Sequence, residues 1–134
     1  MLSPFPDLFT YSFFAPFILR MVAGLIFIDL GVLAFRGEKE RWVSSLSTLR
    51  IPNPKIAVKI FGAIEVIGGA MLILGFYTQI AALVLAILTF CEAYVEYKFP
   101  VVLKRNLVFY VMLLAILLSL LLTGAGAYAF DLPL

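Results

Sequence analysis

Long runs of apolar residues, separated by short polar segments, dominate the chain. A membrane-spanning helix needs about 20 mostly apolar residues. Four stretches meet or approach this length, at about 13–35, 57–76, 79–97 and 106–123. The pattern predicts an all-α integral membrane protein in which residues 1–134 form a single membrane domain. We expect a four-transmembrane-helix bundle with up-down-up-down topology.

The polar segment between the first two stretches has a helical pattern of its own. In EKERWVSSLSTLR, the apolar residues Trp42, Leu46 and Leu49 fall on one helical face and the polar residues fall off it. This predicts a short amphipathic helix lying in the membrane interface. A role as a simple connector between two spans is its simplest interpretation.

The composition removes several classes of function. The chain is 64% hydrophobic and 13% charged, whereas soluble domains are about 45–50% apolar and about 25% charged. A soluble enzyme or a nucleic-acid-binding module is therefore excluded, and the net charge of +2 suggests no nucleic-acid partner. The chain has no histidine, so it offers no histidine ligand to haem or copper. We expect no metal site and no covalently bound cofactor.

Basic residues predict the orientation in the membrane. They concentrate in the first and third predicted loops, as Arg36, Lys39, Arg41, Arg50, Lys55, Lys98, Lys104 and Arg105. Cytoplasmic loops carry an excess of Lys and Arg. We therefore expect loops 1 and 3 to be cytoplasmic, and the N- and C-termini to lie outside.

Lys59 lies at the end of its predicted span and can extend to the interface. Five other charged residues fall inside the predicted spans: Arg20, Asp29, Glu65, Glu92 and Glu96. A charge at mid-helix costs roughly 2.5–3.5 kcal/mol on insertion, so such residues are functional candidates.

Arg20 and Glu65 are predicted to form a structural ion pair. At about 1.5 Å per residue, their backbones lie about 8 Å apart along the membrane normal, which two long side chains can bridge. Each shares a helical face with small residues, which mark close helix contacts in membranes. The glycines expected at helix contacts are Gly24, Gly31, Gly62, Gly68, Gly69 and Gly75.

Glu92, Asp29 and Glu96 are candidates for binding a proton or a ligand. Glu92 and Glu96 are four residues apart and share a helix face; for Glu96, simple contact with the interface is the alternative. Asp29 points about 180° away from Arg20, so contact with a partner protein or a second copy is as good an interpretation as a core site. Three tyrosines near the same end could shape the mouth of a pocket for a ring-bearing lipid such as a quinone: Tyr94, Tyr97 and Tyr110.

The segment from 62 to 90 resembles the core of the DoxX family. The family's Gly-x-x-Glu-x-x-Gly-Gly segment, Leu-Leu-x-Gly segment and Thr-Arg-x-Ala-Ala turn correspond here to Gly62, Glu65, Gly68, Gly69, Gly75, Thr78, Ala81 and Ala82. The first span matches through Leu19, Arg20, Gly24, Phe27 and Gly31, and the run from 122 to 126 resembles the family's Gly-Pro-Gly exit. The chain departs from the family pattern at Gln79 in place of arginine, at Ala125 in place of proline, and at Asp29 or Leu30 where a histidine is common.

The resemblance implies a small four-helix protein of the prokaryotic cytoplasmic membrane. Family members are associated with quinone-linked oxidoreductase systems, so we expect an accessory or quinone-side subunit of a membrane redox complex, with quinone as its one candidate ligand. We expect no catalysis by the chain alone. The alternatives are a purely structural subunit at the edge of a large assembly, and a transporter or channel component with an acidic intramembrane site. The expected partners are the lipid bilayer and either other membrane subunits or further copies in a homo-oligomer.

Overall fold

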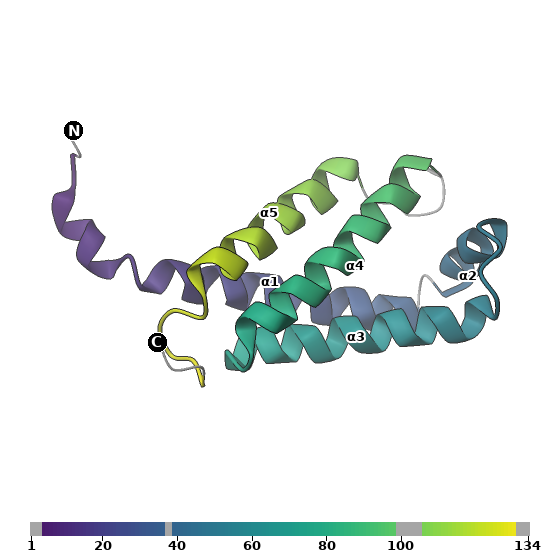
Figure 1. The fold of residues 1–134 in the computed structure, drawn as a ribbon, viewed down its shortest axis with the longest axis horizontal. Helices are drawn as coiled ribbons and strands as arrows, with labels where there is room; N and C mark the ends of the chain where they lie inside the picture. The colour runs from purple at the N-terminus through teal and green to yellow at the C-terminus, as the bar shows by residue number, and fades with distance from the viewer. Residues whose placement is uncertain (1–3, 37–38, 99–105, 131–134) are drawn as a thin grey trace.

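The computed structural model describes residues 4–36, 39–98 and 106–130. Within these ranges the chain is all helical, without strands. A short 3-10 helix, η1 (Pro6–Tyr11), extends away from the bundle (Figure 1). The α-helices that follow are α1 (Phe14–Arg36), α2 (Lys39–Thr48), α3 (Pro54–Leu74), α4 (Thr78–Lys98) and α5 (Leu107–Thr123).

The predicted class of all-α membrane protein is confirmed, whereas the number of spans is not. Three helices, α1, α3 and α4, are long and apolar enough to cross a membrane. α5 is equally apolar but has only 17 residues, so a fourth span stays a prediction. The observed helix ends lie within three residues of the predicted ones. The largest difference is at the start of α3, because Pro54 occupies a first-turn position where its missing N–H costs nothing.

α1 and α3 form the tightest helix pair, and they run antiparallel (Figure 1). A Cβ built on Gly24 would lie 2.7 Å from the carbonyl oxygen of Gly69, and one built on Gly31 would lie 2.7 Å from that of Gly62. Such distances are shorter than real Cβ contacts, so only glycine allows the two backbones to come this close.

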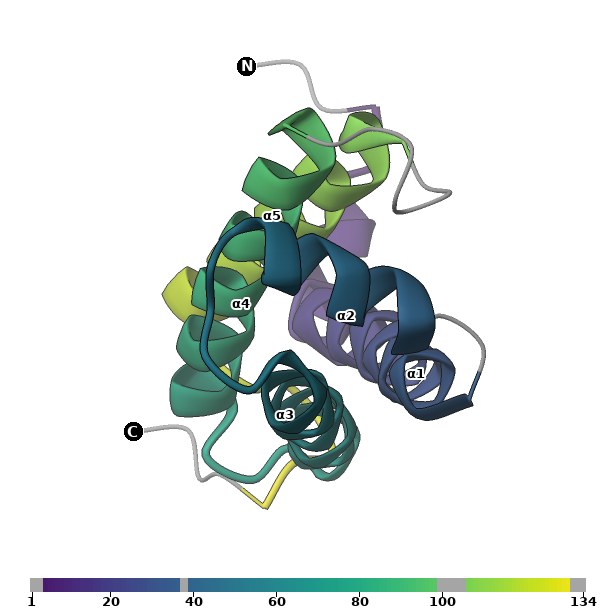
Figure 2. The ribbon, with the colours of Figure 1, turned by 90° about the vertical axis from the view of Figure 1, so that its right-hand side faces the viewer.

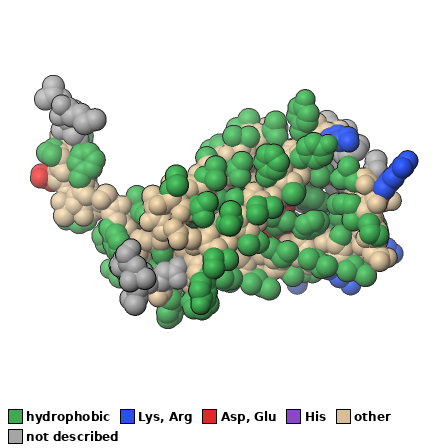
Figure 3. Space-filling view, viewed as in Figure 1, with side chains coloured by type: hydrophobic (Ala, Val, Ile, Leu, Met, Phe, Trp, Pro, Cys, Tyr) green, Lys and Arg blue, Asp and Glu red, His purple; other side chains and the backbone are tan. Residues whose placement is uncertain are grey.

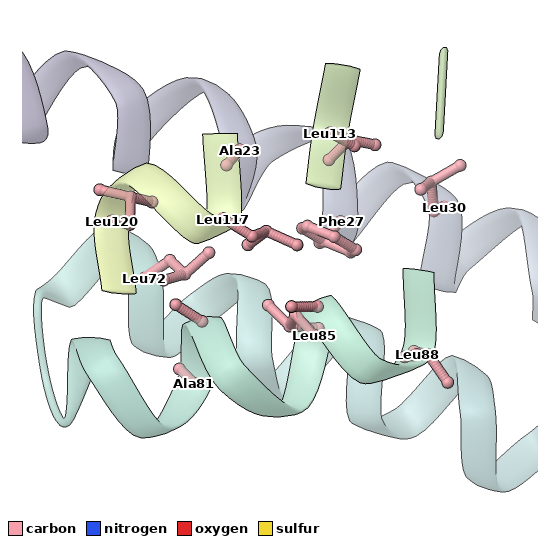
Figure 4. Close-up of a cluster of buried hydrophobic side chains, with 12 residues drawn as sticks. Ala23, Phe27, Leu30, Leu72, Ala81, Leu85, Leu88, Leu113, Leu117 and Leu120 are labelled. Carbon is pink, nitrogen blue, oxygen red and sulfur yellow. The ribbon is translucent and has the colours of Figure 1, made fainter. Parts of the chain in front are cut away.

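α4 and α5 form a second pair, which crosses the first obliquely (Figure 1). Gly68 of α3 faces the side chain of Leu85 on α4, with 2.9 Å between its built Cβ and the Leu85 Cγ. Between the two pairs lies the main hydrophobic core, to which all four helices contribute (Figure 4). Its labelled members include Phe27, Leu72, Leu85 and Leu117.

α2 lies across one end of the bundle, over the ends of α1, α3 and α4 (Figure 2). Trp42 and Leu46 are buried beneath it, as the amphipathic pattern predicts. They belong to a second hydrophobic cluster, which includes Val58 of α3, Val95 of α4 and Tyr110 of α5. The predicted interfacial helix is therefore packed against the bundle, not only against lipid.

Substitution of Gly69 by valine should separate α1 from α3. The added side chain meets the Gly24 carbonyl oxygen, so Gly69→Val should lower the free energy of unfolding by about 1–3 kcal/mol. Thermal unfolding in mild detergent measures the effect. Ala115→Val, at an exposed position of α5, is the matched control and should leave the midpoint nearly unchanged. Equal midpoints for the two variants would contradict the close helix contact.

Candidate functional site

An apolar pocket of about 340 Å³ lies where α3 and α4 diverge toward α2. Figure 1 shows this divergence: the two helices are close at their short connection and separate toward the end of the bundle that α2 covers. α2 and the residues after it, α3 and α4 all supply walls. The lining residues are Trp42, Leu46, Leu49, Ile51, Phe61, Leu88, Phe90, Cys91, Glu92, Tyr94 and Val95.

Glu92 is the charged residue of this lining. It is 5% exposed, so its carboxyl group lies in a largely apolar environment. Glu96 follows one turn later on the same face of α4 and is also buried, at 6% exposed, but it lies outside the pocket lining. The pocket surface is almost wholly apolar, so Glu92 lines it with its hydrocarbon stem, and its carboxyl group lies behind the wall.

The pocket opens on the outer face of α4. Phe90 (65% exposed), Cys91 and Tyr94 belong both to its lining and to the surface of the helix. Figure 3 shows that hydrophobic side chains cover most of the bundle on this view. The Lys98 ammonium lies 5.8 Å from the centre of the Tyr94 ring, at the α2 end of α4. A ligand could therefore enter sideways from the lipid.

The tyrosines predicted to shape a pocket mouth have different positions. Tyr94 lies in the lining, Tyr97 is exposed outside it, and Tyr110 is buried in the cluster beneath α2. Sequence reasoning did not place Trp42, Leu46 and Leu49 in the pocket. The sequence shows that these three residues share an apolar helix face, but it does not show which helices that face covers.

At the opposite end of the bundle, Arg20 is completely buried. Its Nη2 donates hydrogen bonds to the carbonyl oxygens of Ala127, at 2.8 Å, and of Tyr128. The guanidinium carbon also lies 5.2 Å from the centre of the Phe17 ring, and this ring meets that of Tyr128 edge-on. Arg20 therefore fastens the segment after α5 to α1.

Gly75 allows the arginine to take this position. It ends α3 with a φ of +68°, a left-handed conformation that favours glycine. A Cβ at this residue would overlap the Nη1 of Arg20 and the side chain of Ala129. Arg20 thus joins α1, the α3–α4 connection and the C-terminal segment.

The predicted Arg20–Glu65 ion pair stays a prediction. Both residues are buried, with Glu65 at 3% exposed. Since Gly24 faces Gly69 across the antiparallel pair, Arg20 is level with residue 73, eight residues from Glu65. The backbones of Arg20 and Glu65 are therefore offset by about 12 Å along the helix axes. The hydrogen bonds from Arg20 to Ala127 and Tyr128 lead away from Glu65, toward the C-terminal segment.

Asp29 lies apart from the other candidates, exposed on the outer face of α1. The pocket is not lined by it. Of the two interpretations left open by the sequence, its position favours contact with another protein chain. In the described ranges no group of three or more Asp, Glu, Cys or His residues is placed to hold a metal ion.

Comparisons with known proteins identify related sequences. A sequence model of the DoxX family matches residues 15–98. A protein of Bacillus subtilis (strain 168) named "Putative oxidoreductase CatD" is 30% identical over 114 residues, covering 85% of this chain and 82% of that protein. No solved structure matches.

Replacement of Arg20 by lysine should release the C-terminal segment. Lysine lacks the planar fork that reaches two carbonyl oxygens, and hydrogen bonds to charged groups contribute about 1.5–3 kcal/mol each. Arg20→Lys should therefore clearly lower the midpoint of thermal unfolding in detergent. Arg36→Lys makes the same exchange at an exposed position of the same helix and should have little effect. Similar midpoints in the two variants would rule out the fastening role.

Proposed function

Because the chain belongs to the DoxX family, we propose that it is a small accessory subunit of a membrane redox system and binds a quinone in the pocket between α2, α3 and α4. The pocket carries the proposal, since it offers apolar walls at a size suited to one ring and has Glu92 among its lining residues. The match to a protein named as an oxidoreductase supports the redox setting.

The lining suits a quinone in two respects. Trp42 and Phe61 are flat aromatic surfaces for a ring, and the opening beside Phe90 leads an isoprenoid tail into lipid. We assign the polar contact to Glu92, whose side chain turns its carboxyl group into the pocket when the ring is bound. A protonated carboxyl group donates a hydrogen bond to a quinone carbonyl, and a carboxylate accepts one from a quinol hydroxyl. The same group can pass protons to and from the bound ring.

We assign the electron transfer to a partner subunit. The chain has no histidine and a single cysteine, so haem or copper with histidine ligands would belong to the partner. In this arrangement the chain holds the quinone and exchanges its protons, while the partner exchanges its electrons.

The distribution of charge supports an orientation in a prokaryotic cytoplasmic membrane. Basic side chains gather at the end of the bundle near α2 (Figure 3), among them Arg36, Lys55, Lys59 and Lys98. The positive-inside rule places this end, and the pocket with it, on the cytoplasmic side. We include α5 as a fourth span, since its 17 residues reach the lower limit of about 17. Both termini then lie outside.

Trp42 gives a direct test, because it is the only tryptophan of the chain and lies in the pocket. Titration of the purified protein with a short-chain quinone should quench the tryptophan fluorescence to saturation. A saturated alcohol of the same length controls for nonspecific partitioning and should leave the fluorescence unchanged. Leu49→Phe adds a ring to the pocket wall and should abolish the saturable phase.

Glu92 variants test the polar contact. Glu92→Leu removes the hydrogen bond and should weaken quinone binding about tenfold or more, whereas Glu92→Gln keeps a donor and an acceptor and should retain most of the affinity. Glu96→Leu is the matched control, one turn away and outside the lining. Quenching that never saturates, or that responds equally to Glu92→Leu and Glu96→Leu, would overturn the proposal.

A further inference from the structure

α1 leaves one narrow face outside the bundle. Between Phe17 and Phe35 its exposed residues follow a spacing of four, three, four and three, which is the heptad spacing of a helix that packs against one other helix. The face consists of Ile18, Val22, Leu25, Asp29 and Val32. We call these five residues the α1 seam.

Asp29 is the polar residue of this apolar seam. It lies seven residues before Arg36, so it is about 10 Å inside the end of the helix. In membranes, ionisable residues at such depths almost always face protein or a water-filled cavity, because acyl chains offer no hydrogen bonds. A carboxyl group on the outer face of a spanning helix therefore indicates that another chain covers the seam.

We propose that the α1 seam is a dimer interface that binds a second copy of this chain, with the two α1 helices parallel. Two copies insert in the same orientation, so a two-fold axis along the membrane normal brings Asp29 of each copy to the same depth. Two carboxyl groups that face each other can share a proton in a hydrogen bond, which lipid offers to neither of them alone. Each Asp29 carboxyl group thereby gives the other one a hydrogen-bond partner. A single polar pair in a heptad seam also fixes the register of the two helices.

This inference does not depend on the quinone pocket, which lies on α2, α3 and α4. Cysteine cross-linking in native membranes tests it, with Cys91 first replaced by serine. Leu25→Cys places a thiol in the seam, and Ile87→Cys places one on the exposed face of α4. The two positions match closely: both are 59% exposed, and both lie eleven residues before the α2 end of their helices, Arg36 and Lys98.

Mild oxidation should give a disulfide-linked dimer from Leu25→Cys and several-fold less from Ile87→Cys. Equal yields would show random collision in the membrane and overturn the proposal. A cross-linked product whose mass is not twice that of the chain would also overturn it, because another protein would then cover the seam.

The role of Asp29 is tested in the same Leu25→Cys background. Asp29→Leu should raise the dissociation constant of the dimer in detergent about threefold or more, in line with measured polar contacts between membrane helices. Asp29→Asn, which can still form a paired hydrogen bond, should keep most of the dimer. If Asp29→Leu dimerises as well as the parent, the carboxyl pair is absent and the proposal fails.

Discussion

The close contact between α1 and α3 is the constraint on which the other features of the bundle depend. Glycines on both helices bring the two backbones together in their middle part, where Gly24 meets Gly69 and Gly31 meets Gly62. With α1 and α3 fixed side by side, α4 and α5 pack across them as a second pair, and α3 and α4 separate as they leave their short connection. α2 covers the space that this separation opens, and the pocket lies beneath it. The pocket therefore depends on the angle at which the second helix pair crosses the first.

Hydrocarbon surroundings explain where the charges lie. Arg20, Glu65, Glu92 and Glu96 all point into the protein, as expected when lipid can satisfy none of their hydrogen bonds. They also divide between the two ends. Arg20 fastens the C-terminal segment at one end, while Glu92 is placed in the pocket toward the other. Asp29 departs from this rule and lies on the outside. A second chain at this position would restore the rule, because Asp29 would then be inside the assembly.

Much of the fold could be predicted from the sequence, since apolar length determines the helices of a membrane protein almost alone. Arg20 and Glu65 are buried in the structure, on the helix faces that they share with Gly24 and Gly31, and with Gly62 and Gly69, because 3.6 residues per turn fix which residues share a side. Two hydrogen-bond partners of Arg20 could not be predicted in this way. They are the backbone carbonyls of Ala127 and Tyr128, over a hundred residues away, and backbone atoms leave no signal in a residue pattern. The pocket could be predicted only in part: Tyr94 and Glu92 were candidates for it, whereas its walls on α2 and α3 were missed for a similar reason. The apolar face of α2 was evident, but the angle between α3 and α4 depends on packing between helix pairs.

The space between Trp42 and Glu92 is the proposed binding site for the ring of a quinone. The most direct measurement is a crystal structure of the protein, purified from its own membrane without added quinone and crystallised in a lipidic phase. We predict density for a planar ring in the pocket, with one oxygen within hydrogen-bond distance of the Glu92 carboxyl group and a tail leaving beside Phe90. Density for a lipid acyl chain alone in that space, or a pocket closed by its own side chains, would contradict this proposal.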